Sequence, residues 1–374
     1  MNPRDLGLRT AALVAVAAPH ALHAQPPAAP ADIELPPSRT VPAEQTAAAY
    51  EDPNWQVPRT SWGDPLLAGT WSTDDMRGIP RDRPEELGTQ EFLSEEQFLE
   101  RARTQEAGRQ RAVNEETFLR NEWGTRTFGF TSLVVDPPNG RTPPLTEAGR
   151  ARAEARGRGT FGSGPFNTFE DFSLYDRCIS LGINRGMGAA IYGNGILIFQ
   201  SPKVVSITYE MIHETRVIPL DGRPHLDDAL VQFTGNGRGY WDGDTLVIET
   251  RGFNGRTSVG GPPSSKSLRT IERIRRVDPE MIEYRITVDD PETYTAPFTV
   301  RTMWTTQPGY EVYEYSCHEG NSAVRMGLSG ERAYERQVAE ALAEGREPPR
   351  RSSGLEVYRP PAEDAQIFDI NAGE

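Results

Sequence analysis

The stretch Tyr240-Trp241-Asp242-Gly243-Asp244-Thr245-Leu246-Val247-Ile248 places an Asp-Gly turn signal between two apolar runs, a pattern typical of a β-hairpin. Comparable turn signals recur at Asn194-Gly195, at Asp278-Pro279-Glu280 and at Gln307-Pro308-Gly309. The apolar runs beside these turns predict strands over 204–207, 211–218, 269–276, 281–288, 298–305 and 310–317. Roughly eight or nine antiparallel strands without interleaved helices favour a mainly β fold. We expect an antiparallel meander closed into a barrel over 189–328, because closure hides the edge strands.

The segments around the predicted barrel carry helix signals. Ser94 and Gln97 have the spacing of a capping box, and Thr146 can cap a second helix. The helices are predicted over 95–112, from 146 to about 156, and over 331–344, before Gly345. We expect an α+β segment over 61–188 that packs on the barrel, and a terminal helix with a disordered tail over 329–374.

Composition limits the class of partner. The 374 residues carry a formal net charge of −14 and a mean hydropathy of −0.58. An acidic surface repels phosphate backbones, so we expect no nucleic-acid partner. No apolar run reaches the length of a membrane span, so we expect none. The oligomeric state is not indicated.

The first residues resemble a secretory signal. Arg4 and Arg9 precede a short apolar run, and Ala24 offers a cleavage point before Gln25. We therefore expect a signal peptide over 1–24 and a periplasmic or secreted protein. Residues 25–60 are rich in Pro and Ala and are predicted to be a tether.

Cys178 and Cys317 are the two cysteines of the chain. In an oxidising compartment such a pair favours a disulfide, which would bring Arg177 beside His318. A nucleophilic or metal-bound cysteine is the alternative.

Three histidines remain after the predicted signal, and each has a carboxylate nearby in sequence. They are His213, His225 and His318, and the adjacent carboxylates include Glu214 and Glu319. A histidine beside a carboxylate suits general acid–base catalysis because its pKa can lie near neutrality. Strand alternation would place His213 and Glu214 on opposite faces unless a bulge or a strand end intervenes. A purely structural role for each histidine is the alternative.

The candidate roles follow from these residue types. His318 is the first candidate for the catalytic base or acid, oriented by Glu319 or Glu214, with His213 assisting. The candidate substrate-binding residues are Arg216 and Arg177, for an anionic group, together with His225 and Tyr315. No cofactor is indicated. A metal is not indicated either, because spacing such as His-Glu-x-x-His is absent. The absence of a Gly-x-Ser-x-Gly elbow weakens a serine-hydrolase route.

Four segments resemble the recurring motifs of a large family of exported bacterial proteins of uncharacterised function. They are VDPPNGRTPPL at 135–145, EMIHETRVIPLDGRPH at 210–225, WDGDTLVIET at 241–250 and YSCHEGN at 315–321. The resemblance covers about 65–325 and implies that His213, His225, His318 and Glu319 belong to the family's motifs, without implying an activity. The strand order of the barrel part also resembles calycin-type folds.

The combined interpretation is an exported protein that binds a small organic molecule in a calycin-like β-barrel. We expect an enzyme that uses His/Glu acid–base chemistry, of isomerase, lyase or hydrolase type. Two alternatives stay open: a non-catalytic, lipocalin-like carrier, and a metal-dependent hydrolase.

Overall fold

The computed structural model describes residues 33–42, 55–114, 122–155, 164–190, 192–259 and 261–351. These residues form one antiparallel sheet of ten strands together with three α-helices, which confirms the predicted mainly β fold with few helices. The predicted signal peptide lies outside the described residues, as do most of the predicted tether and the tail beyond residue 351.

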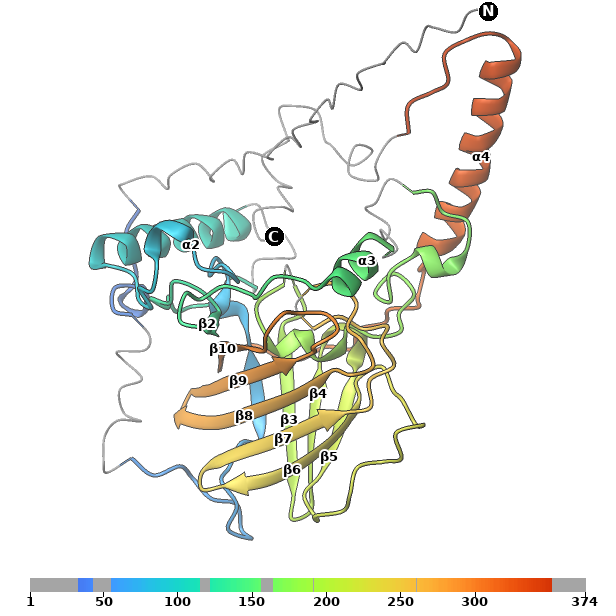
Figure 1. Cartoon of the computed structure of the whole chain (residues 1–374). Coiled ribbons are helices and arrows are strands. Elements are labelled where there is room, and N and C mark those ends of the chain that lie inside the picture. The colour runs from blue at the N-terminus through green and yellow to red at the C-terminus, as the bar shows by residue number, and fades with distance from the viewer. Residues whose placement is uncertain are drawn as a thin grey trace, which may run out of the picture.

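The sheet joins strands from both halves of the chain (Figure 1). Its hydrogen-bonded order is β5-β4-β3-β1-β10-β9-β8-β7-β6, and β2 pairs with β10. The strands are β1 Gly69–Ser72, β2 Val134–Asp136, β3 Gly195–Ser201, β4 Val204–Tyr209, β5 Thr215–Pro219, β6 Asn236–Asp242, β7 Thr245–Arg251, β8 Arg269–Asp278, β9 Met281–Asp289 and β10 Phe298–Thr305. The segment 61–188 thus contributes β1, the strand that links β3 to β10.

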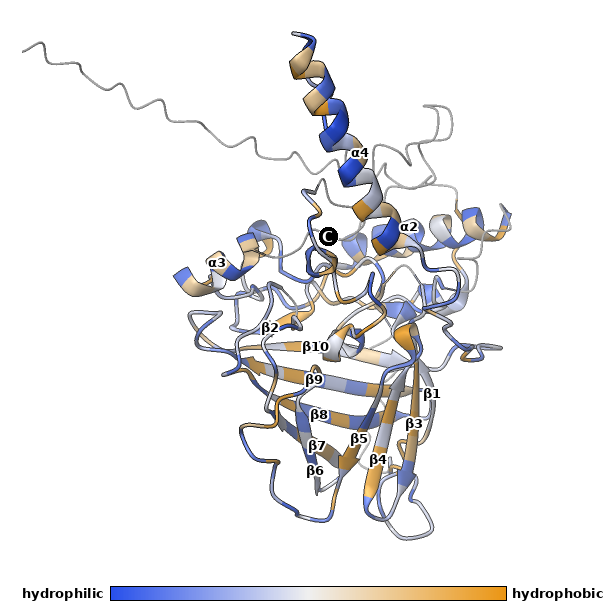
Figure 2. Ribbon diagram, turned by 90° about the vertical axis from the view of Figure 1, so that its right-hand side faces the viewer, coloured by the Kyte–Doolittle hydropathy of each residue, from blue (hydrophilic) through white to orange (hydrophobic). Residues whose placement is uncertain are grey.

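The sheet bends so that β3, β4 and β5 cross β6 to β9 at a steep angle, with the core between the two halves (Figures 1 and 2). Alternation turns one face of each strand toward this core, since every second residue is buried along β4 and along 269–275 of β8. The apolar core includes Ile207, Ile218, Ile248, Ile274, Tyr284 and Trp304.

The predicted barrel closure is not observed. Among the described strands no ladder joins β5 to β6, so the sheet is open between its two edges. Side chains cover this seam instead. A Cβ at Gly239 would lie 2.6 Å from Leu220 Cδ2 and 2.9 Å from Ile218 Cγ2. Glycine at this position therefore lets β5 pack closely on β6 without backbone pairing.

The predicted hairpins are confirmed at β6–β7 and β8–β9, but two other predictions at turn signals are wrong. Asn194-Gly195 does not form a hairpin turn. The Asn194 side chain accepts from the Ala190 N–H at 2.7 Å and donates to Asp74 at 2.7 Å, and β3 begins after it. The predicted strand over 310–317 is also absent, because this segment leaves the sheet and binds elsewhere.

The helices lie mainly on the β10 side of the sheet, and α4 projects away from it (Figures 1 and 2). Their bounds are α2 Glu95–Asn114, α3 Glu147–Ala155 and α4 Ala323–Ala343. The capping box is confirmed, since Gln97 Oε1 accepts from the Ser94 N–H and Ser94 Oγ accepts from the Gln97 N–H. α4 begins eight residues before the predicted 331, with Phe172 packed against Gly327. Within the described residues no helix is long and apolar enough to cross a membrane.

A buried ion pair lies inside the bent sheet. Arg216 of β5 donates to both oxygens of Glu272 on β8, at 2.8 and 2.5 Å. The Tyr284 hydroxyl donates to Glu272 at 2.9 Å. Both charged side chains are almost fully buried, so each depends on the other for compensation of its lost hydration.

We expect Arg216→Met to destabilise the protein by about 3–5 kcal/mol, because it leaves Glu272 buried without its cation. The double variant Arg216→Met/Glu272→Leu should recover most of this loss. The matched control is Arg273→Met, which removes an exposed pair with Asp242 and should cost at most about 1 kcal/mol. Urea unfolding measures all three, and equal losses at Arg216 and Arg273 would contradict the assignment.

Candidate functional site

Three segments that are distant in sequence meet beside the last residues of β4 and the first residues of β5. Cys178 and Cys317 form a disulfide with a Cα–Cα distance of 5.7 Å, across a sequence separation of 139, so the predicted pairing is confirmed. The 3₁₀ turn η8 (Met211–His213) contacts the same region, with His213 Nδ1 3.1 Å from the Tyr315 carbonyl oxygen. The fold therefore brings the neighbourhoods of residues 178, 213 and 317 together.

Glu210, which follows β4, holds the 310–317 segment in this place. Its carboxylate accepts from the Gly195 N–H at 3.1 Å, from the Tyr313 N–H at 3.2 Å and from the Tyr310 hydroxyl. A Cβ at Gly195 would lie 2.8 Å from Glu210 Oε2 and 2.9 Å from Val312. Glycine here thus serves close packing of the 310–317 segment rather than a turn.

The backbone of this region is strained. Ile212 has φ 63°, His213 has φ 45° and Cys178 has φ 54°, and no other non-glycine residue in the described ranges has a positive φ. For a β-branched residue such as Ile212 this conformation is a marked outlier. Strain of this kind costs about 1–3 kcal/mol per residue and is found preferentially at functional sites.

The hydrogen bond to Tyr315 determines the tautomer of His213. A carbonyl oxygen can only accept, so His213 Nδ1 carries the proton and donates to it. In the neutral ring Nε2 then keeps its lone pair and can act as a base. The His213 side chain is exposed, and the break in the predicted strand at η8 frees it from strand alternation.

The other predicted catalytic residues occupy different environments. His318 and Glu319 lie in the exposed turn after Cys317, and within the described residues the His318 ring forms no hydrogen bond. Glu214 is partly buried, and both its oxygens accept from the Ser180 hydroxyl, at 2.9 and 2.8 Å. Burial raises the pKa of Glu214, against the opposing effect of the Ser180 hydrogen bond.

The predicted substrate-binding residues are not gathered at one place. Arg216 points into the core, where Glu272 occupies its guanidinium. Arg177 lies over the Phe169 ring, with Cζ 5.6 Å from the ring centroid. His225 lies on the β5–β6 connection, with Nδ1 2.8 Å from the Asn236 carbonyl oxygen.

Tyr315, the fourth of these residues, belongs to a cluster of three tyrosines. The Tyr175 hydroxyl lies 2.7 Å from that of Tyr192 and 3.1 Å from that of Tyr315, and the third edge measures 3.4 Å. We call these three residues the tyrosine trio. Burial raises the pKa values of Tyr175 and Tyr315, so both phenols stay protonated near neutral pH.

A carboxyl pair, Asp74 and Glu122, lies at the same end of the sheet. Asp74 follows β1 and is completely buried, and it accepts from Ser72 Oγ at 2.6 Å. Burial, followed by the charge of Asp74, raises the pKa of Glu122 to about 7. Two adjacent carboxyls do not both ionise readily, so this pair tends to retain one proton.

Arg185 lies beside the carboxyl pair and the tyrosine trio. It belongs to the 3₁₀ helix η7 (Gly182–Gly186), which is held to β10 because Thr302 and Trp304 both donate to the Gly186 carbonyl. Its Nη2 donates to the Gly193 carbonyl at 3.0 Å and to Asn194 Oδ1 at 2.9 Å. Its Nε is buried without a hydrogen-bond partner among the described residues.

Sequence reasoning missed the carboxyl pair, Arg185 and two members of the trio. Their separations in sequence form no recognised motif, because the contacts are made only when loops from different strands meet. The sequence carries a weak signal for the trio, since Tyr175 lies three residues before Cys178 and Tyr315 lies two residues before Cys317.

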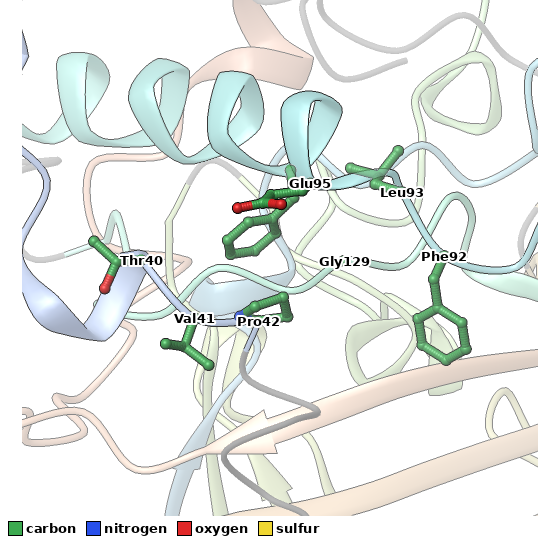
Figure 3. A pocket seen from close by; sticks show the side chains of 8 residues that line it. Thr40, Val41, Pro42, Phe92, Leu93, Glu95 and Gly129 are labelled. Carbon is green, nitrogen blue, oxygen red and sulfur yellow. The ribbon is translucent and has the colours of Figure 1, made fainter.

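A separate hollow of about 500 Å³ lies between the start of α2 and the 40–42 segment (Figure 3). Thr40, Val41 and Pro42 form one wall, and Phe92, Leu93 and Glu95 contribute from the other side. Phe98 also lines the hollow. None of the predicted site residues lines it. We therefore do not assign the predicted chemistry to this hollow.

Comparisons with known proteins do not identify the chain. No protein-family model matches it, and neither the curated proteins nor the solved structures include a significant match. Within the described ranges, no group of three or more histidine, cysteine, aspartate or glutamate residues is arranged to hold a metal ion.

The carboxyl pair makes stability depend on pH. Because the pKa of Glu122 is raised to about 7, the unfolded chain loses this proton at lower pH than the folded chain. The stabilising contribution is thus present below about pH 4.5, the ordinary value, and is lost as pH rises to about 7. Glu122→Gln cannot ionise, so we expect it to reduce the fall in stability between about pH 5 and 7.5.

Urea unfolding of both proteins at the two pH values measures this effect. Glu311→Gln, at an exposed carboxylate in the neighbouring segment, is the matched control and should follow the wild type. An unchanged fall in the Glu122→Gln variant would show that Glu122 has an ordinary pKa.

Proposed function

We propose that this chain is an exported enzyme that performs acid–base chemistry on a small organic molecule, with His213 as the group that transfers the proton. The observation that carries the proposal is the bond from His213 Nδ1 to the Tyr315 carbonyl, 3.1 Å long, on a backbone with φ 45° at His213. This bond leaves Nε2 as the basic nitrogen on an exposed ring. The strain is the kind of cost that proteins retain where geometry matters for function.

The proposal retains the wider sequence-based interpretation. The fold would be a calycin-like barrel closed by side chains across the β5–β6 seam, and the chain would belong to the exported family that its motifs resemble. A periplasmic or secreted location agrees with the disulfide. We place the ligand at the end of the barrel near His213, because the Arg216–Glu272 pair and Tyr284 occupy the interior.

His213 takes precedence over His318 in this proposal. Within the described residues the His318 ring has no bond that would orient it, whereas Tyr315 orients His213. A base held in one orientation loses less entropy on reaching the transition state. His318 and Glu319 then belong to the exposed rim of the site, where they can contact substrate.

The variant His213→Asn tests the proposal with little disturbance of the fold. The asparagine amide can keep the donor that Nδ1 supplies to Tyr315, and asparagine tolerates a positive φ, but it has no basic nitrogen. We expect turnover to fall about 10²- to 10⁴-fold. The probes are p-nitrophenyl esters for hydrolysis, ketones in D₂O for isomerase-type exchange and β-hydroxy ketones for elimination.

Asp242→Asn is the matched control. Asp242 is exposed at the end of β6 and pairs with Arg273 at 2.7 Å, so turnover should stay within about twofold of wild type. Unchanged turnover in His213→Asn would refute the role of His213. Probes bound by the wild type and returned chemically unaltered would favour a carrier instead.

A further inference from the structure

The tyrosine trio has the geometry of a hydrogen-bond donor array. Its members come from three segments, and the disulfide holds two of them because Tyr175 and Tyr315 lie near Cys178 and Cys317. The Tyr192 and Tyr315 rings are nearly parallel, with an interplanar angle of 14°. All three hydroxyls are partly buried, which strengthens their hydrogen bonds relative to those in water.

Counting protons shows that the trio can donate to a ligand. Each phenol has one O–H donor, and the two short edges of the trio, at 2.7 and 3.1 Å, use two of the three protons. When Tyr192 donates to Tyr175 and Tyr175 donates to Tyr315, the Tyr315 proton remains for an outside acceptor. The longest edge, from Tyr192 to Tyr315 at 3.4 Å, competes only weakly for it.

Arg185 supplies a positive charge near that acceptor. The positive charge of Arg185 lies close enough to oppose the rise that burial causes in the pKa of Tyr315. The buried Nε of Arg185 has no hydrogen-bond partner among the described residues, while the charge of its guanidinium also interacts with Asp74 and Glu122. A cation near a phenol that donates a hydrogen bond favours negative charge on the atom that accepts it.

Tyr315 links this donor array to the proposed base. Its carbonyl oxygen accepts from His213 Nδ1, and its hydroxyl belongs to the trio. One residue therefore sets the positions of the group that removes a proton and of the group that receives negative charge. The disulfide at Cys317, two residues later, restrains both.

We propose that the tyrosine trio is an oxyanion hole for the enolate of a carbonyl substrate that has an acidic α-hydrogen. The proposal rests on the proposed function, since His213 supplies the base. His213 Nε2 takes the α-proton, and the electrons of the broken C–H bond form a C=C bond. The carbonyl π electrons move to oxygen, which accepts a hydrogen bond from Tyr315. In a substrate with a β,γ-double bond the enolate extends to the γ-carbon, and return of the proton to that carbon completes an isomerisation without a further reactant.

The first experiment measures oxyanion binding without catalysis. The probe is 4-nitrophenol, whose absorbance distinguishes the bound phenolate from the phenol. We expect wild type to bind the phenolate and Tyr315→Phe, which keeps the ring, to bind it at least tenfold more weakly. Tyr240→Phe is the matched control, because Tyr240 is exposed on β6 and its hydroxyl lies 3.4 Å from Glu249. Equal binding by Tyr315→Phe and wild type would overturn the proposal.

The second experiment separates this inference from the proposed function. Deuterium exchange into cyclohexanone, followed by NMR, should slow about 10²- to 10³-fold in Tyr315→Phe, the loss expected for one oxyanion donor. His213→Asn should slow exchange about 10²- to 10⁴-fold but leave phenolate binding unchanged. Normal exchange in His213→Asn would defeat the proposed function alone, while normal exchange in Tyr315→Phe would defeat the oxyanion hole. If Tyr315→Phe does not fold, Tyr175→Phe replaces it in both experiments; it removes the hydroxyl that donates to Tyr315 and weakens Tyr315 as a donor, so a smaller loss is expected.

Discussion

The carboxylate of Glu210 is the interaction on which the candidate site depends. By accepting from Gly195, Tyr310 and Tyr313 it ties the start of β3 to the segment that follows β10. That segment would otherwise be free to extend the sheet as a strand. Held against Glu210 instead, it carries Tyr315 to His213 and Cys317 to Cys178. Three hydrogen bonds to the Glu210 carboxylate thus hold the 310–317 segment, whose sequence resembles a strand, beside the site.

Polar groups are distributed unevenly over the fold. The interior of the bent sheet is occupied by apolar side chains and one closed ion pair, Arg216–Glu272, so it offers little room for chemistry. Arg185, the carboxyl pair and Glu210 lie instead where β1, β3 and β4 begin or end. Strand ends and their loops are where a rigid sheet can present functional groups without losing backbone pairing.

The sequence predicted those parts of the structure that depend on local signals. Alternation and the turn at Gly243 identified β6 to β9, the Ser94 capping box identified α2, and the compartment argument identified the disulfide. It failed where tertiary contacts override local preference. Asn194-Gly195 has the composition of a turn, but Asn194 donates to Asp74 and Gly195 donates to Glu210. The predicted barrel is not closed, because side chains instead of a ladder lie across the seam at Gly239. The site shows the same division, because His213 was visible as a rare ionisable residue, whereas Arg185 and Tyr192 became visible only when loops met.

The central claim is that the Tyr315 carbonyl fixes His213 as the Nδ1–H tautomer and so leaves Nε2 as the base. The most direct measurement is ¹⁵N NMR of the histidine side chains in the full-length protein at a pH where the rings are neutral. Our account predicts a protonated Nδ1 and an unprotonated Nε2 for His213, with His318 showing the mixture of tautomers expected for an unrestrained ring. A protonated Nε2 as the main form of His213 would contradict it.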